Sequence, residues 1–312
     1  MKYFEVKNLS IGYEKALFED INIDACLGEM IAIVGANGVG KSTFLKTIVG
    51  ILPQKQGKIF IDGIEKSNYS IQQLSKIIGF SATHNIFAPN LKVRDIVKIG
   101  RSPYTSLLGI LSPNDHLIVN QAIEQTGIYA IAHKEISKIS DGQRQRAFVA
   151  RLIAQNTNIL VFDEPTAFLD IEGKINIVDL FAQIAKKQNK LVIFSTHDLN
   201  FALNFCDKIW LMAKNKILSA CPEDHIIQNN FSNLFGANSI FFDNTNANFY
   251  VSSKQKNPIF VENKSTQLRL VWTLNLLKRC GLEHNENCSN KIEINENNWL
   301  IYIKNKQYEA HS

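Results

Sequence analysis

The chain has 312 residues and a formal charge of +5, with 34 Lys and Arg against 29 Asp and Glu. This length predicts one domain of ordinary size and a smaller addition, and the scattered Lys excess lacks the clustered stripe that nucleic acid binding requires. No apolar run is long enough to span a membrane, and the charged start of the chain is unlike a signal peptide. We therefore expect a cytosolic protein that reaches a membrane only through a partner.

The first informative pattern is an apolar run, residues 30–34, that leads into Gly-Ala-Asn-Gly-Val-Gly-Lys-Ser at 35–42. The run predicts a parallel strand covered on both faces, and residues 42–49 predict a helix. The segment between them matches the phosphate-binding pattern G-x-x-x-x-G-K-[ST] without a mismatch. Its glycines allow backbone N–H groups to point at the α- and β-phosphates of a nucleotide. Lys41 brings a charge toward the β- and γ-phosphates, and the Ser42 hydroxyl can reach Mg²⁺.

Residues 91–104 predict an amphipathic helix that Gly100 and Pro103 bring to an end. The helix belongs to a mainly helical region, about 85–150, that interrupts the α/β pattern. It can dock onto a partner protein, or it can pack only within its own chain. The sequence leaves both interpretations open.

Residues 139–154 predict a second helix with a polar start. The stretch 148–154 has helical periodicity, and Ser140 is well placed as the N-cap. The residues at 139–143 are Ile-Ser-Asp-Gly-Gln. This motif alone is also compatible with an ordinary capped helix.

Two further buried strands are predicted, and each ends in polar residues. The run 158–162 leads into Asp163 and Glu164, and the run 191–195 leads toward His197. In a doubly wound sheet such strands deliver their C-terminal residues to the same edge as the phosphate-binding loop. Asp163 is therefore placed to hold Mg²⁺, and Glu164 is placed to polarise an attacking water as a general base.

Taken in order, these motifs resemble those of the ATP-binding subunits of ABC transporters. Residues 139–143 resemble the signature motif of that family, usually written L-S-G-G-Q, and residues 167–170 resemble the loop that crosses between the two cassettes of the dimer. The resemblance covers residues 1–235. It implies an α/β fold, a P-loop NTPase ABC cassette with a helical subdomain at about 85–150, and it implies ATP and Mg²⁺ as cofactors.

The resemblance also implies roles for individual residues. His197 resembles the switch histidine that contacts the γ-phosphate, and Tyr13 lies where the family has its adenine-stacking aromatic residue. Glu164 and His197 are thus the expected catalytic residues, and Ser42 and Asp163 are the expected Mg²⁺ ligands. The residues expected to bind the nucleotide are Tyr13, Gly35, Asn37, Gly38, Gly40, Lys41, Ser42, Thr43, Ser140, Gly142 and Gln143.

Three positions depart from the family pattern. Ile139 replaces the Leu of the signature, and Asp141 replaces its first Gly. Thr83, with His84 beside it, stands where the family usually has a Gln that links Mg²⁺ and water to the membrane partner. Thr can still donate and accept hydrogen bonds, but we assign no catalytic role to Thr83.

The resemblance further implies partners and a class of substrate. Residues 91–104 resemble a stretch found in siderophore, haem and cobalamin importers, and the Asp141 form of the signature is often met in the same branch. This implies an ATP-hydrolysing subunit at the cytoplasmic face of the inner membrane that energises the import of iron-siderophore, haem or cobalamin. Its expected partners are polytopic permease subunits, indirectly a substrate-binding protein, and a second copy in the ATP-bound state, with no nucleic acid.

Other classes of protein remain as alternatives. An ATPase of another importer class, for a metal ion or another solute, would share the motifs. A non-transport ABC ATPase acting on ribosomes would usually carry two cassettes, and one acting on DNA would carry long heptad coils between Lys41 and Ser140. A kinase or GTPase would share the phosphate loop but would not explain residues 139–143 or His197.

Residues 236–312 predict a small α+β appendage, an accessory domain of unknown role. Apolar clusters occur at 240–242, 248–251 and 258–261, and strands are expected at 291–294 and 299–303. The expected helix at 267–280 is too apolar to be solvated on all sides, so it packs on its own sheet, on the cassette or on a second copy. Cys280, His284 and Cys288 are evenly spaced, but a structural zinc site requires four ligands.

Overall fold

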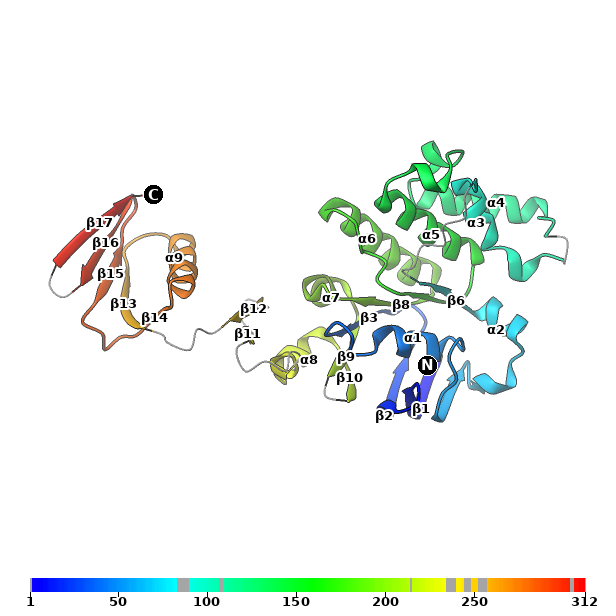
Figure 1. The fold of residues 1–312 in the computed structure, drawn as a ribbon, viewed down its shortest axis with the longest axis horizontal. Helices are drawn as coiled ribbons and strands as arrows, with labels where there is room; N and C mark the ends of the chain where they lie inside the picture. Colours follow the sequence, from blue (N-terminus) through cyan, green and yellow to red (C-terminus); the bar gives the residue numbers. More distant parts are fainter. Residues whose placement is uncertain are drawn as a thin grey trace. The chain divides into compact units, whose positions relative to one another are not determined.

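The computed structural model describes residues 2–82, 90–106, 109–213, 215–233, 240–243, 248–251, 257–303 and 306–311. The chain forms two compact units (Figure 1). The first consists of Met1–Gly236 and Asn244–Asn248, and the second consists of Ala237–Asp243 and Phe249–Ser312. Each unit is built around its own hydrophobic core.

A six-stranded sheet forms the centre of the first unit, in the order β10-β9-β3-β8-β7-β6. Neighbouring strands from β9 to β6 are parallel, and β10 runs antiparallel to β9. The bounds are β3 Met30–Gly35, β6 Ile78–Ser81, β7 Ile159–Phe162, β8 Leu191–Thr196, β9 Lys208–Ala213 and β10 Lys216–Ala220. The predicted strands at 30–34, 158–162 and 191–195 are confirmed as β3, β7 and β8. All three are buried along their whole length, as coverage on both faces requires.

The helix that follows the phosphate-binding loop also packs against a second sheet, which has four antiparallel strands. Its order is β2-β1-β4-β5, with bounds β1 Phe4–Gly12, β2 Ala16–Ala25, β4 Gln56–Ile61 and β5 Ile64–Glu65. Helix α1, Lys41–Ile48, shares one core with strands of both sheets. At its centre Trp210 of β9 contacts the rings of Phe4 and Phe44, with centroids 6.3 and 5.9 Å away. The start of α1 is thus fixed relative to both sheets.

Helices cover the other face of the central sheet (Figure 1). Helix α6, Ile171–Gln188, places Phe181 against Phe162 of β7 at a centroid distance of 4.4 Å. The other helices of this unit are α2 Ile71–Ile77, α3 Val93–Ile99, α4 Pro113–Gln125, α5 Asp141–Gln155, α7 Leu199–Phe205 and α8 Pro222–Ile227. Short 3₁₀ turns lie at Lys66–Asn68, Ser102–Tyr104, Tyr129–Ile131, Ile136–Lys138 and Asn230–Asn233.

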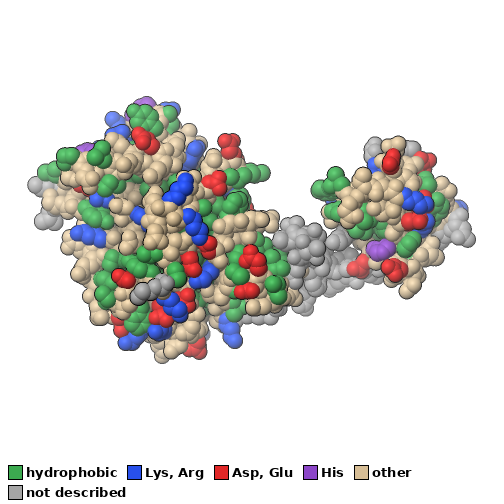
Figure 2. Space-filling model, turned by 180° about the vertical axis from the view of Figure 1, so that it is seen from behind, with side chains coloured by type: hydrophobic (Ala, Val, Ile, Leu, Met, Phe, Trp, Pro, Cys, Tyr) green, Lys and Arg blue, Asp and Glu red, His purple; other side chains and the backbone are tan. Residues whose placement is uncertain are grey.

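Helices α3, α4 and α5 form a helical region with a separate core. The apolar residues Val93, Ile96 and Val97 of α3 are all buried in it. Most of the apolar face of α3 is therefore used inside the chain, while Ile99 at its end is 48% exposed. Within the described ranges, no helix is long and apolar enough to cross a bilayer. On the face drawn in Figure 2, Lys and Arg of this unit are interspersed with Asp and Glu.

The second unit packs one helix against a five-stranded sheet, in the order β14-β13-β15-β16-β17. Its bounds are β13 Asn257–Asn263, α9 Gln267–Arg279, β14 Leu282–His284, β15 Lys291–Ile294, β16 Asn298–Ile303 and β17 Lys306–His311. A two-stranded sheet, β11 Ile240–Asp243 and β12 Asn248–Val251, accompanies them. The predicted helix at 267–280 is confirmed as α9, and one of its faces packs on its own sheet.

The evenly spaced Cys280, His284 and Cys288 do not converge on one point in the described structure. His284 accepts a hydrogen bond at Nδ1 from the N–H of Val261, at 3.1 Å. The Cys288 thiol donates to the carbonyl of Pro258, at 3.0 Å. Among the described residues no group of three or more His, Cys, Asp or Glu side chains could hold a metal ion.

A buried ion pair ties the helical region together. Arg101 donates from Nε to Oδ1 of Asp115 at 2.8 Å and from Nη1 to the carbonyl of Ala154 at 2.9 Å. Both charged side chains are almost fully buried, and the guanidinium lies over the ring of Tyr104. Hydrogen bonds from Ser112, together with Arg101, lower the pKa of Asp115 to about 2. The pair thereby connects the segment after α3 to both α4 and α5.

We predict that Asp115→Asn destabilises the first unit by about 3 kcal/mol, because it leaves a buried guanidinium without its counter-charge. The folded-state pKa of Asp115 is depressed, so its contribution is complete above the unfolded pKa of about 4 and is lost as the pH falls toward 2. Denaturant midpoints of the parent and the variant should therefore converge in acid. The control is Asp95→Asn, which removes a half-exposed pair with Lys98 worth less than about 1 kcal/mol. Equal midpoints for the parent and Asp115→Asn at neutral pH would refute the prediction.

Candidate functional site

The loop between β3 and α1 lines a pocket of about 220 Å³ at the edge of the central sheet. Gly38 and Gly40 have φ values of 77° and 115°, in a region that residues with a Cβ rarely adopt. The backbone of the loop can therefore curl around a ligand at the N-terminus of α1, where free N–H groups favour an anion. The pocket is lined by Asn37, Gly38, Gly40, Lys41, Ser42, Thr43 and Glu164.

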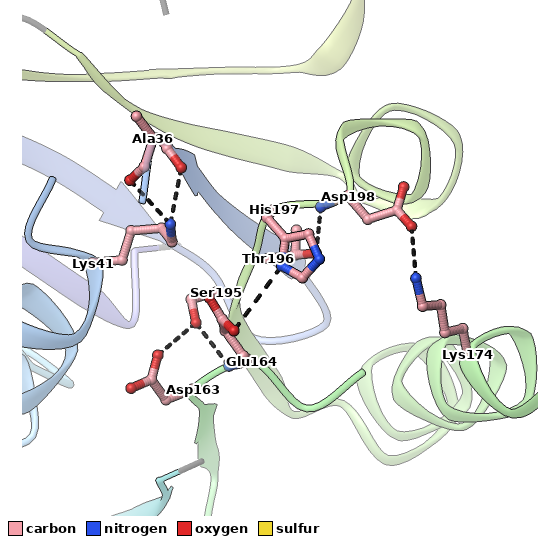
Figure 3. A network of polar contacts seen from close by, with 10 residues as sticks. Ala36, Lys41, Asp163, Glu164, Lys174, Ser195, Thr196, His197 and Asp198 are labelled. Atoms are coloured by element: carbon pink, nitrogen blue, oxygen red, sulfur yellow. Dashed lines mark hydrogen bonds and ion pairs between the residues drawn. The ribbon is translucent and has the colours of Figure 1, made fainter. Parts of the chain in front are cut away.

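The Lys41 ammonium is held inside this loop (Figure 3). It donates to the carbonyl of Gly35 at 2.9 Å and to that of Ala36 at 3.3 Å. The side chain is only 6% exposed. Burial lowers the pKa of Lys41, and the nearby carboxylates of Glu164 and Asp163 oppose that shift. An anion bound in the pocket would compensate for the burial of this charge.

Asp163 and Glu164 follow β7, and a residue of β8 joins them. The Ser195 hydroxyl donates to Oδ1 of Asp163 at 2.7 Å and accepts from the N–H of Glu164 at 2.8 Å (Figure 3). Asp163 is only 7% exposed. Glu164 has a φ of 47°, so the backbone turns sharply at this residue. The buried Asp163 is thus fixed in position, while the next side chain reaches the pocket.

Glu164, which lines the pocket, lies close to His197. Nδ1 of His197 lies 4.0 Å from Oε2 of Glu164, and the two side chains are 56% and 31% exposed. His197 follows directly after β8, and the next residue, Asp198, pairs with Lys174 of α6 at 3.2 Å. The histidine is therefore held on a turn that is anchored on its far side (Figure 3).

The structure brings only some of the predicted residues to this pocket. Tyr13 lies in the turn between β1 and β2, is 62% exposed and is not among the residues that line the pocket. Ser140 and Gln143 form a reciprocal capping box at the N-terminus of α5, and the described lining contains no residue of the signature stretch 139–143. Thr83 and His84 lie outside the described residues.

Sequence reasoning missed Ser195. Its signal was present, because Ser195 is a polar residue at the end of an otherwise apolar buried run. A buried hydroxyl needs hydrogen-bond partners, and the carboxylate side chain and backbone N–H at the end of a neighbouring strand supply them. What the sequence did not reveal is that β8, and not another strand, lies next to β7.

The fold and the phosphate-binding loop define a P-loop nucleotide-binding protein, and comparisons identify its family. The family model for ABC transporters matches residues 18–167. An uncharacterized ABC transporter ATP-binding protein of Methanocaldococcus jannaschii is 32% identical over 78% of this chain and 83% of its own length. The iron(3+)-hydroxamate import ATP-binding protein FhuC of Bacillus subtilis is 32% identical over 70% of this chain and 81% of its own length.

A solved structure gives the same result. An ABC transporter assigned to the metal-chelate type, in an inward-facing conformation, shares 28% identity and a TM-score of 0.67 over 80% of this chain and 96% of the matched chain. The chain therefore belongs to the ATP-binding proteins of ABC transporters, which bind and hydrolyse ATP. The predicted cassette fold is confirmed.

Proposed function

We propose that this chain energises the import of ferric siderophores or closely related metal chelates through separate membrane subunits. The observation that carries the proposal is the match to the iron(3+)-hydroxamate import protein over 81% of its length. It agrees with the importer-like stretch 91–104 and with Asp141 in the signature. Membrane subunits would hold the chain at the cytoplasmic face of the membrane, with a substrate-binding protein acting on the other side.

Under this proposal, residues of the pocket and two residues outside its lining have roles in ATP hydrolysis. The loop N–H groups and Lys41 hold the phosphates, which stabilises charge that develops on them. Glu164 orients the attacking water and takes its proton as a general base. His197, which lies 4.0 Å from Glu164, contacts the γ-phosphate. Exposed Tyr13 offers a ring face on which adenine can stack.

The oxygen donors present also fit Mg²⁺. Ser42 is exposed at the N-terminus of α1 and lines the pocket, and Asp163 is a buried carboxylate that Ser195 holds in place. Hydroxyl and carboxylate oxygens are the ligands that Mg²⁺ prefers, together with phosphate oxygens. The ion would neutralise charge on the phosphates.

We infer that a second copy of the chain completes the site. Ser140, Gly142 and Gln143, at the N-terminus of α5, are not among the described residues that line the pocket of their own chain. A head-to-tail dimer would place this terminus, with its free N–H groups, at the γ-phosphate bound by the other copy. The ATP-bound homodimer would then hold two sandwiched nucleotides, and its closure and reopening would drive the membrane subunits.

We predict that Glu164→Gln retains ATP binding but loses about 10²–10⁴-fold in turnover, the typical contribution of a general base. The amide keeps the size of the side chain but cannot accept the proton. ATPase rates are compared with those of Glu172→Gln, a control on an exposed residue at the start of α6. A Glu164→Gln protein that turns over at the parental rate would remove Glu164 from this role.

The importer proposal is tested by uptake in cells that lack the gene for this chain. We expect the parental gene, but not the Glu164→Gln form, to restore uptake of a radiolabelled ferric siderophore. Haem and cobalamin uptake, measured in parallel, identify the substrate within the branch. If deletion leaves the uptake of all three compounds unchanged, the proposed substrate class is wrong, although the ATPase chemistry would stand.

A further inference from the structure

One fully buried hydroxyl joins the two residues that follow β7. Ser195, near the end of β8, has no exposed surface. Its hydroxyl donates to Oδ1 of Asp163 at 2.7 Å and accepts from the backbone N–H of Glu164 at 2.8 Å (Figure 3). A hydroxyl has one proton to donate, and an ionised carboxylate can only accept. The direction of both hydrogen bonds is therefore fixed while Asp163 is ionised.

The first of these bonds acts on the carboxylate to which we assign Mg²⁺. The backbone N–H of Asp163 donates to the carbonyl of Ser81, the last residue of β6, at 2.9 Å. The main chain of Asp163 is thus held from β6, and its side chain is held from β8. Loss of the Ser195 hydroxyl would therefore act on the carboxylate and leave the end of β7 in place. Partners that orient a metal ligand in this way tune the affinity of the metal site.

The second bond acts on the backbone of the general base. Glu164 has a φ of 47°, a conformation that a residue with a Cβ keeps only where its surroundings hold it. The Ser195 hydroxyl holds the N–H of Glu164, and the N–H of Ala167 holds its carbonyl at 3.1 Å. This turn carries the Glu164 side chain into the lining of the pocket. Ser195 thereby supports the direction of the side chain that would activate water.

We propose that Ser195 is a positioning residue for ATP hydrolysis, which sets both the Mg²⁺ ligand and the general base through one hydroxyl. The inference rests on the proposed function, because the roles of Asp163 and Glu164 belong to it. Ser195 is not among the described residues that line the pocket, so it acts through these two neighbours. Loss of its hydroxyl should alter the Mg²⁺ requirement and the rate of hydrolysis together.

A buried hydroxyl can also serve the core alone, and Thr157 is a matched example in the same sheet. It is fully buried, and its hydroxyl donates to the carbonyl of Ile159 at 2.8 Å. Thr157 precedes β7, so it lies at the opposite end of this strand from Asp163. Loss of either hydroxyl removes a hydrogen bond from a buried acceptor and should lower stability. A purely structural role for Ser195 predicts no more than this.

The test compares the full-length parent, Ser195→Ala and the control Thr157→Val. ATP hydrolysis is measured over a Mg²⁺ series, ATP affinity by calorimetry with and without Mg²⁺, and stability by denaturant midpoints without nucleotide. In Ser195→Ala we expect kcat to fall, and the Mg²⁺ concentration for half-maximal rate to rise, each by about 10–100-fold. The affinity for ATP without Mg²⁺ should stay at the parental value, because Lys41 and the loop remain. Thr157→Val should change only the midpoint.

Two further variants at Ser195 test the hydroxyl itself. Ser195→Thr keeps the hydroxyl and should restore the parental Mg²⁺ dependence. Ser195→Cys keeps a weak donor of similar shape and should lie between the parent and Ser195→Ala. The cysteine variant decides the question if the alanine variant does not fold. Parental kinetics in folded Ser195→Cys and Ser195→Ala proteins would overturn the proposal.

Parallel measurements on Asp163→Asn and Glu164→Gln separate this inference from the proposed function. If both carboxylate variants lose turnover while Ser195→Ala keeps the parental kcat and Mg²⁺ dependence, the positioning role is wrong and the assigned chemistry stands. If both carboxylate variants keep parental kinetics, the assigned chemistry is wrong and the positioning role falls with it. If Ser195→Ala and Thr157→Val lower stability and kcat equally, with no change in Mg²⁺ dependence, Ser195 is structural and the proposal is overturned.

Discussion

The carboxyl ends of the parallel strands β3, β8 and β7 lie side by side at one edge of the six-stranded sheet. This arrangement brings together the side chains to which we assign the phosphate chemistry. Strand β8 pairs with β3 on one side, where Val34 lies opposite Thr196, and with β7 on the other, where Phe162 lies opposite Phe194. The loop that follows β3 and Glu164, which follows β7, therefore open into a common pocket. The strand between them supplies Ser195 and His197 to the same edge.

The site contains two buried charged residues and two partly exposed side chains. Lys41 and Asp163 are 6% and 7% exposed. Lys41 donates a hydrogen bond to the carbonyl of Gly35, and Asp163 accepts one from the Ser195 hydroxyl. Burying these groups is unfavourable unless they are paired. A bound nucleotide with its cation would add charged partners next to Lys41 and Asp163, so ligand binding and the stability of this edge should be coupled. Glu164 and His197, by contrast, are partly exposed to solvent.

Local patterns in the sequence predicted the elements that carry the site. An apolar run followed by glycines fixed the prediction of β3 and α1, because a covered parallel strand and a phosphate loop each have a strong local signature. The neighbours of each strand could not be predicted, since pairing joins residues far apart in the chain. For the same reason the sequence did not reveal the bond from Ser195 to Asp163 or the buried pair of Arg101 with Asp115. The predicted role of Tyr13 is a contact with adenine, and that of the signature stretch is a contact with the nucleotide of a second copy. The structure of one chain without ligands contains neither contact.

The most direct measurement of the central claim is the affinity for ATP with Mg²⁺ by calorimetry, in the parent, Lys41→Ala and Lys46→Ala. Lys46 lies on the same helix α1, outside the pocket, and its replacement should leave the dissociation constant unchanged. Lys41→Ala removes a charge-assisted phosphate contact of roughly 1.5–3 kcal/mol, so the dissociation constant should rise about tenfold or more. An unchanged dissociation constant for a folded Lys41→Ala protein would show that the nucleotide does not bind at this edge of the sheet.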